Sequence, residues 1–256
     1  MMNAEDLNHL IARADERRQE SENGEEDEMI MSRWHEKEKP PHQLLRPIKM
    51  SAVGSDFLDR SVVTFSLYNS FNYSLFLSKE KEPEKLSIGI TSPGYGEGKT
   101  TTVCNLAAAL STGAGRKTVI VDLNLGRPRI HEVFGIPMGP GLAEALLGND
   151  ICVVPTQLEN LFALPVGDTR MVPLSKLHAF REILASLFNE FDFVIVDMPP
   201  AGTRGFPTLI ANQLSGLLVV VRSRVTKRRE IGRVLRKVRE ENVLGFVMNG
   251  VNENDV

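Results

Sequence analysis

The chain has 256 residues, 42% of them hydrophobic, and a net charge of −3, values that suit one globular α/β domain with extensions and argue against a nucleic-acid partner. Its two cysteines, Cys104 and Cys152, have neither metal-ligand nor redox spacing, and no stretch approaches the roughly 18–20 apolar residues that a membrane span needs. Because the polar, acidic N-terminus does not resemble a signal peptide, we expect a cytoplasmic protein.

The N-terminal part differs in composition from the rest. Residues 1–50 are rich in charge and include a run of four acids at residues 25–28, so they cannot bury enough apolar surface to offset their ordering entropy. We therefore predict a largely disordered extension over residues 1–50 and one folded domain over residues 51–256. A short helix over residues 4–18 is either solvated or a docking segment. The aromatic-rich residues 55–77 predict a helix that packs on the domain or forms a subunit contact.

A phosphate-binding pattern lies in residues 86–110, which read LSIGITSPGYGEGKTTTVCNLAAAL. The order is a short apolar strand, a glycine-rich loop and a helix that opens on Gly98-Lys99-Thr100, an arrangement that aims backbone N–H groups at an anion. Pro93 stands where the strict pattern has its first glycine. Lys99 is expected to reach the β- and γ-phosphates of a nucleotide, and Thr100 to bind Mg²⁺. The predicted nucleotide-binding residues of this segment are Gly94, Gly96, Glu97, Gly98, Lys99, Thr100 and Thr101.

Two further apolar runs end in a carboxylate. Residues 117–121 precede Asp122, and residues 191–196 precede Asp197. Ligands of open α/β sheets bind outside the carboxyl ends of the strands, so we expect both acids to face the phosphate loop, where they would help Thr100 to hold Mg²⁺. For Asp197 the alternative is a turn residue or a helix cap.

The remaining patterns complete the predicted fold. Strands are expected at residues 161–166, 217–221 and 243–248, and helices at residues 131–134, 141–147, 175–189 and 227–241. This alternation predicts an α/β fold, a doubly wound and mostly parallel sheet with helices on both faces. Asn249 follows the last strand and is either a contact to the purine edge or a turn residue. The basic side of helix 227–241 is a solvated face or, secondarily, a surface for a membrane or an acidic partner.

Together, the segments TSPGYGEGKTT, VIVDLNLGRP and FDFVIVDMPP resemble the bacterial tyrosine kinases of capsule and exopolysaccharide export, a P-loop family related to the MinD/ParA ATPases. The likeness covers about residues 50–251. It implies ATP and Mg²⁺ as cofactors, Lys99, Asp122 and Asp197 as catalytic residues, and Thr100, Asp122 and Asp197 as metal ligands. It also implies a membrane chain-length partner of polysaccharide export that recruits the chain to the inner membrane, and a dimer or larger homo-oligomer.

The sequence departs from the family in three places. Asn124 replaces a second acid and cannot act as a base, no tyrosine follows Tyr95, and Phe65, Tyr68 and Phe71 stand where the ring-forming helix has a Glu and two Arg. ATP binding tolerates these changes, whereas C-terminal self-phosphorylation does not. The alternative functions are a non-kinase ATPase and a nucleotide-dependent regulatory switch of the MinD/ParA type. The early lysine of that type is absent, since Gly94 or a neighbour takes its place.

Overall fold

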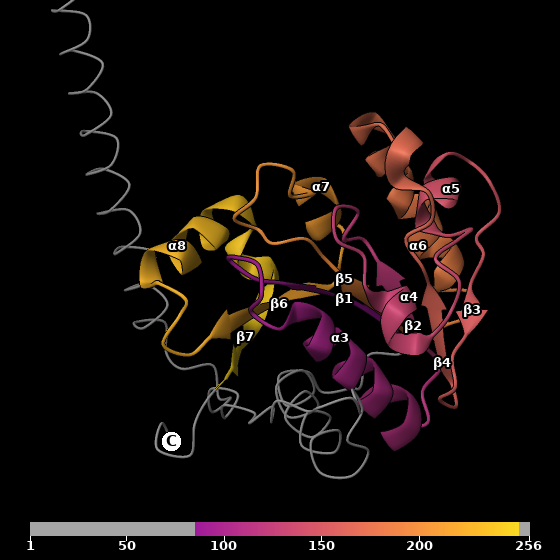
Figure 1. The fold of residues 1–256 in the computed structure, drawn as a ribbon, viewed down its shortest axis with the longest axis horizontal. Coiled ribbons are helices and arrows are strands. Elements are labelled where there is room, and N and C mark those ends of the chain that lie inside the picture. Colours follow the sequence, from indigo (N-terminus) through magenta and orange to yellow (C-terminus); the bar gives the residue numbers. More distant parts are fainter. Residues whose placement is uncertain (1–84, 251–256) are drawn as a thin grey trace, which may run out of the picture.

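The computed structural model describes residues 85–250, and within them seven strands form one sheet in the order β3-β4-β2-β5-β1-β6-β7 (Figure 1). All neighbouring strands are parallel except β3 and β4. The strands are β1 (Leu86–Thr91), β2 (Thr118–Asp122), β3 (Val154–Pro155), β4 (Leu161–Leu164), β5 (Phe193–Asp197), β6 (Gly216–Arg222) and β7 (Val243–Asn249). The helices are α3 (Lys99–Ala108), α4 (Ile130–Phe134), α5 (Leu142–Leu146), α6 (Phe180–Leu187), α7 (Thr208–Ala211) and α8 (Arg228–Lys237).

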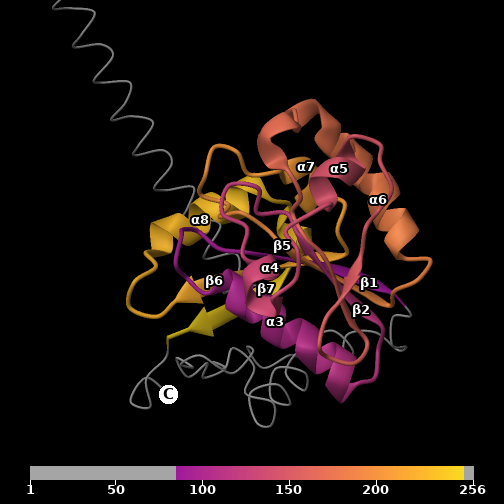
Figure 2. The same ribbon diagram turned by 45° about the vertical axis from the view of Figure 1, so that its right-hand side comes forward.

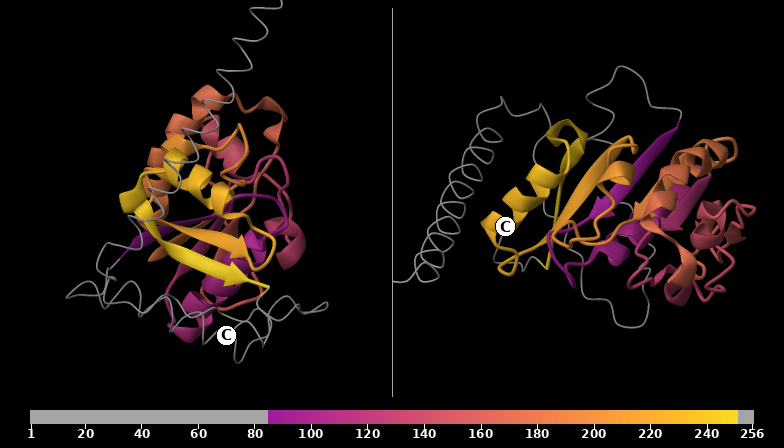
Figure 3. Two further views of the ribbon diagram at one scale, coloured as in Figure 1. Left: turned by 90° about the vertical axis from the view of Figure 1, so that its left-hand side faces the viewer. Right: turned by 90° about the horizontal axis from the view of Figure 1, so that it is seen from above.

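Helices cover both faces of the sheet. Alternate residues of the central strands point to opposite sides, and because both sides are buried these strands consist of continuous apolar runs. One core cluster joins Ile88, Ile120 and Ile195 to α3 and α4, and the other joins the intervening strand positions to α5, α6, α7 and α8. Figure 2 shows α3 and α4 on one side and α5, α6 and α8 on the other. Seen from above in Figure 3, α8 lies toward the β6–β7 edge.

The predicted doubly wound α/β fold is thus confirmed, with corrections at element ends. The predicted helix 175–189 is a 3₁₀ helix (Leu174–Ala179) followed by α6, and the predicted helix 227–241 ends at Lys237 because Val238 adopts an extended backbone. Beyond α3, Ala109–Gly113 continues as a π-helix. The short strand β3 and the helix α7 were not predicted.

Several predictions lie outside the described residues. These concern the extension over residues 1–50, the helices over residues 4–18 and 55–77, and the substitutions at Phe65, Tyr68 and Phe71. Among residues 85–250, no helix combines the length and the apolar character needed to cross a membrane.

The carboxyl ends of three central strands meet at one edge of the sheet. Ile90 of β1 is in register with Asp197 of β5, and Asp197 in turn is in register with Asp122 of β2. The loop that leaves β1 therefore starts beside Asp197, with Asp122 one strand further across the sheet. The parallel pairing of non-consecutive strands thus brings together residues that are far apart in the chain.

Candidate functional site

The phosphate loop, residues 92–98, connects β1 to α3 and has the backbone that its glycines allow. Gly96 and Gly98 have φ angles of 75° and 100°, in the left-handed region that side chains with a Cβ disfavour. At Gly98 a Cβ would also lie 1.9 Å from Asn249 Nδ2. The loop thus needs glycine at residue 98 for its conformation and for the close approach of the Asn249 side chain at the end of β7.

Lys99 folds back over this loop. Its Nζ donates hydrogen bonds to Ser92 Oγ at 2.9 Å and to the Gly94 carbonyl at 3.3 Å. Burial lowers the pKa of Lys99, while the charges of Asp197 and Glu97 act in the opposite direction. The structure therefore places the predicted lysine in contact with the loop and within the electrostatic influence of the acid at the end of β5.

Thr100 and Asp197 form the direct link between the loop helix and the strand-end acids. Thr100 Oγ1 donates to Asp197 Oδ2 at 2.7 Å, whereas Asp197 Oδ1 is buried and has no hydrogen-bond partner within the part of the chain that the structure describes. Desolvation, helped by the nearby charge of Asp122, raises the pKa of Asp197 to about 7. A buried carboxylate oxygen without a partner is costly, and beside a threonine hydroxyl it offers the hard oxygen ligands that Mg²⁺ prefers. The residues present therefore fit a magnesium ion.

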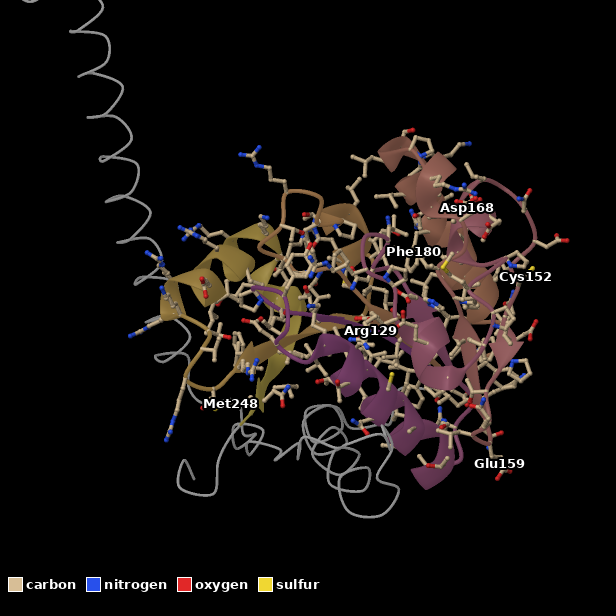
Figure 4. All side chains as sticks on the ribbon, in the orientation of Figure 1. Arg129, Cys152, Glu159, Asp168, Phe180 and Met248 are labelled. Carbon is tan, nitrogen blue, oxygen red and sulfur yellow. The ribbon has the colours of Figure 1, made fainter. Side chains whose placement is uncertain are left out.

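Asp122 has a more constrained environment than the sequence suggested. Its Oδ1 accepts a hydrogen bond from Asn124 N, and its Oδ2 accepts from Arg129 N and Ile130 N, all at 3.1 Å (Arg129 is labelled in Figure 4). These bonds hold the loop after β2 and satisfy donors at the start of α4. Desolvation outweighs them and raises the pKa of Asp122 to about 6. The observed contacts of Asp122 organise this loop, and its roles toward metal and substrate remain predictions.

Glu97 and Asn249 hold the loop from the side of β6 and β7. Glu97 is buried, and its carboxylate accepts hydrogen bonds from Gly94 N at 3.0 Å and from Thr226 Oγ1 at 2.6 Å. The Asn249 Nδ2 donates to the Glu97 carbonyl at 2.9 Å. Both residues were predicted to bind nucleotide, but their side chains contact the protein, and a purine contact of Asn249 stays a prediction. Thr226 was missed, because a threonine after a strand has no distinguishing local pattern.

The segment after β5 also supports the phosphate loop. The N–H groups of Ala201 and Gly202 donate to the carbonyls of Ser92 and Pro93 at 2.8 and 3.1 Å. A Cβ on Gly202 would lie 2.2 Å from the Pro93 oxygen, so this close approach also needs glycine. Lys237, at the end of α8, donates to the carbonyls of Ala201 and Thr203 at 2.7 and 2.8 Å. No pattern in the sequence indicates this contact of Lys237.

At the outer end of the loop, Tyr95 is exposed and stacks against the neighbouring loop. The Arg127 guanidinium carbon lies 4.4 Å from the Tyr95 ring centroid, and Lys99 Nζ lies 5.9 Å from it. Cations at such distances interact favourably with the ring face. The phosphate loop and the loop after β2 therefore meet at Tyr95, with two positive charges beside its ring.

Comparisons with known proteins identify the family of this chain. Residues 88–256 match the CobQ/CobB/MinD/ParA nucleotide binding domain family. The tyrosine-protein kinase CpsD of Streptococcus agalactiae serotype III is 30% identical over 180 residues, which are 67% of this chain and 77% of CpsD.

Two solved structures extend the comparison. The chimerical protein CapA2B2 superposes with a TM-score of 0.68 at 27% identity and covers 76% of this chain and 87% of its own. The septum site-determining protein MinD of Pyrococcus horikoshii, in complex with Mg-ADP, has a TM-score of 0.55 at 27% identity and covers 67% of this chain and 74% of its own. The chain belongs to the CobQ/CobB/MinD/ParA nucleotide-binding family and, within it, to the branch of the bacterial tyrosine-protein kinases.

Proposed function

We propose that this chain binds ATP with Mg²⁺ and transfers the terminal phosphoryl group to tyrosine in partner proteins of capsule or exopolysaccharide assembly. The observation that carries the proposal is the pair Thr100–Asp197, in which one buried carboxylate oxygen has no protein partner within the described residues and lies beside a hydroxyl at the start of the loop helix. The tyrosine-kinase name of the relative CpsD supports the choice of reaction.

The roles of the residues follow from charge neutralisation and positioning, which dominate phosphoryl transfer. The N–H groups of the loop and of Thr101 bind the phosphates, and Lys99 leaves Ser92 and Gly94 to neutralise their charge. Thr100 and Asp197 would hold Mg²⁺, which would supply positive charge to neutralise the phosphates. Asp122, with a pKa of about 6, is ionised at neutral pH and is the candidate acceptor of the proton from the tyrosine hydroxyl, or a further metal ligand.

The setting is proposed with the reaction. We infer that residues 51–256 form the kinase domain and that the protein acts in the cytoplasm beside a membrane chain-length protein. We also infer that it self-associates into a dimer or a larger assembly and has no nucleic-acid partner. These inferences rest on the family resemblance and on the acidic net charge.

A phosphorylation assay tests the reaction. Purified wild-type chain, with labelled ATP, Mg²⁺ and a synthetic Glu/Tyr copolymer, is expected to form phosphotyrosine. Lys99→Met is expected to lose at least about 10-fold in rate, because a charge-assisted contact to phosphate is worth about 1.5–3 kcal/mol. Lys176→Met serves as the matched control, since Lys176 is an exposed lysine remote from the loop. Equal rates for wild type and Lys99→Met would contradict the proposal.

A second candidate is a nucleotide-dependent switch without phosphotransfer, favoured by Asn124 in place of a second acid. Asn124 is buried and its N–H binds Asp122, so Asp122 has no neighbouring carboxylate two residues along the chain. ATP-dependent association or ATP hydrolysis, without phosphotyrosine on the copolymer, would select this candidate.

A further inference from the structure

The outer face of α8 has a concentrated positive charge. Residues 227–239 contain seven basic residues and one acidic residue, Glu230. Val234 and Leu235 pack into the core, which turns the opposite side of the helix to solvent, and Arg228, Arg229 and Arg233 are exposed. Figure 4 shows nitrogen-tipped side chains projecting outward around α8. We call these three arginines the α8 basic face.

Nothing in the described part of the chain neutralises the α8 basic face. The ion pairs found among residues 85–250 do not involve these arginines, and the Glu230 carboxylate accepts from the backbone N–H of Lys227. Arg229 and Arg233 are four residues apart, a spacing at which like charges destabilise a helix by about 0.2–0.5 kcal/mol. The charge therefore does not stabilise α8 itself, which favours an anionic binding partner.

The chain has a complementary segment of its own. Residues 20–28 contain six acids and no base: Glu20, Glu22, Glu25, Glu26, Asp27 and Glu28. The described structure begins at Lys85, so residues 29–84 connect this segment to β1. Residues 29–50 alone, which precede the proposed kinase domain, would span about 25 Å on average as a random coil, more than half the diameter of a domain of this size, and a tether of this length gives an effective concentration near the millimolar range.

We propose that the acidic segment, residues 20–28, docks on the α8 basic face of the same chain. A membrane surface would offer the same anionic chemistry, but the segment is covalently attached, whereas a lipid surface must also overcome the net charge of −3. Since Thr226 precedes α8 and contacts Glu97, and Lys237 ends α8 and contacts Ala201, the docking site lies on an element that supports the phosphate loop from both sides.

The sequence supplies an intrinsic probe of this docking. Trp34 is the only tryptophan and lies six residues after Glu28, so its fluorescence anisotropy reports the motion of the N-terminal segment alone. In the full-length protein, Trp34 anisotropy is expected to fall when NaCl is raised from about 20 mM to about 500 mM, because salt screens exposed charges. It is also expected to be independent of protein concentration, as docking within one chain requires.

Charge exchange makes the test specific. Arg229→Glu/Arg233→Glu is expected to lower the low-salt anisotropy to its high-salt value, and adding Glu25→Lys/Glu26→Lys to this variant is expected to restore it. Lys176→Glu/Arg181→Glu makes the same charge change at exposed positions before and within α6 and is expected to leave the anisotropy unchanged. Circular dichroism of every variant checks folding, and the restored anisotropy of the combined variant separates docking from unfolding.

Three results would overturn the proposal. One is an anisotropy that does not respond to salt or to the α8 exchange. Another is an anisotropy that rises with protein concentration, which indicates docking between copies. The last is that the Arg229→Glu/Arg233→Glu exchange abolishes binding to phosphatidylglycerol vesicles and leaves the Trp34 anisotropy unchanged. That result would assign the α8 basic face to a membrane. None of these readouts depends on kinase activity, so the proposed function can fail while this proposal holds.

Discussion

Among residues 85–250, Asp122 and Asp197 are the carboxylates whose environment deviates most from that of ordinary surface carboxylates. They are fully buried and in register on adjacent strands. Burial raises the pKa of Asp122 to about 6, and burial together with the charge of Asp122 raises the pKa of Asp197 to about 7. Between the unfolded pKa near 4 and these raised values, the folded chain holds more protons than the unfolded chain. Its stability without metal therefore falls as the pH rises from about 4 to about 7.

Replacing one acid by its neutral isostere tests whether stability falls as the pH rises. Asp197→Asn keeps an acceptor for Thr100 Oγ1 and removes a buried charge, so without Mg²⁺ we expect it to raise the free energy of unfolding at pH 8 by about 1–3 kcal/mol and to change it little at pH 4. Urea unfolding at both pH values, with a chelator present, measures the difference. A variant equally destabilised at both pH values would show that hydrogen bonding, not charge, dominates at residue 197.

At the scale of elements, most of the fold could be predicted from the sequence. The runs before Asp122 and Asp197 are buried strands in the structure, because continuous β-branched stretches of this length suit the centre of a parallel sheet. The end of α8 at Lys237 could not be predicted, since the apolar spacing continues through Val238 while its backbone is extended. Periodicity reports which side chains are buried and not where the helical hydrogen bonds stop.

The candidate site likewise contains residues that the sequence predicts and contacts that it does not. The positions of Lys99, Thr100 and Asp197 follow from local motifs plus the rule that ligands bind at the carboxyl ends of strands. The contacts of Glu97 with Thr226 and of Lys237 with Ala201 join segments far apart in sequence, and no local pattern specifies them. The sequence thus indicates the groups that would bind a nucleotide, whereas the hydrogen bonds that hold the phosphate loop can be identified only from the folded structure.

Lys237 offers a prediction at this scale. Lys237→Met keeps the aliphatic stem and removes the two hydrogen bonds to the carbonyls of Ala201 and Thr203, so we expect a loss of about 1–2 kcal/mol in unfolding free energy. The nucleotide affinity should also fall a few-fold, since the same segment holds Ser92 and Pro93. Urea unfolding and nucleotide titration measure the two effects. Arg239→Met, which changes an exposed base just beyond α8, is the control, and equal behaviour of both variants would refute the support role.

For the whole molecule, the site joins the two halves of the sheet. The phosphate loop leaves the central strand β1 and is held by contacts from the β6–β7 side through Thr226 and Asn249, and from the segment after β5 through Ala201 and Gly202. A ligand that binds this loop only in its folded geometry stabilises every element that contributes a contact. Binding should therefore be visible as a change in global stability and not only as a local effect.

We therefore expect ATP with Mg²⁺ to raise the thermal midpoint of unfolding. At a ligand concentration about 100 times the dissociation constant, linkage supplies about 2.7 kcal/mol, which corresponds to roughly 5–10 °C for a domain of this size. Removing Mg²⁺ with a chelator should reverse most of the shift, because Asp197 Oδ1 then lacks the cation that compensates its burial. Differential scanning calorimetry of wild type, Lys99→Met and the control Lys176→Met measures the effect. The same shift in wild type and Lys99→Met would mean that the nucleotide binds away from the phosphate loop, since Lys99 is the cation that folds over that loop and contacts Ser92.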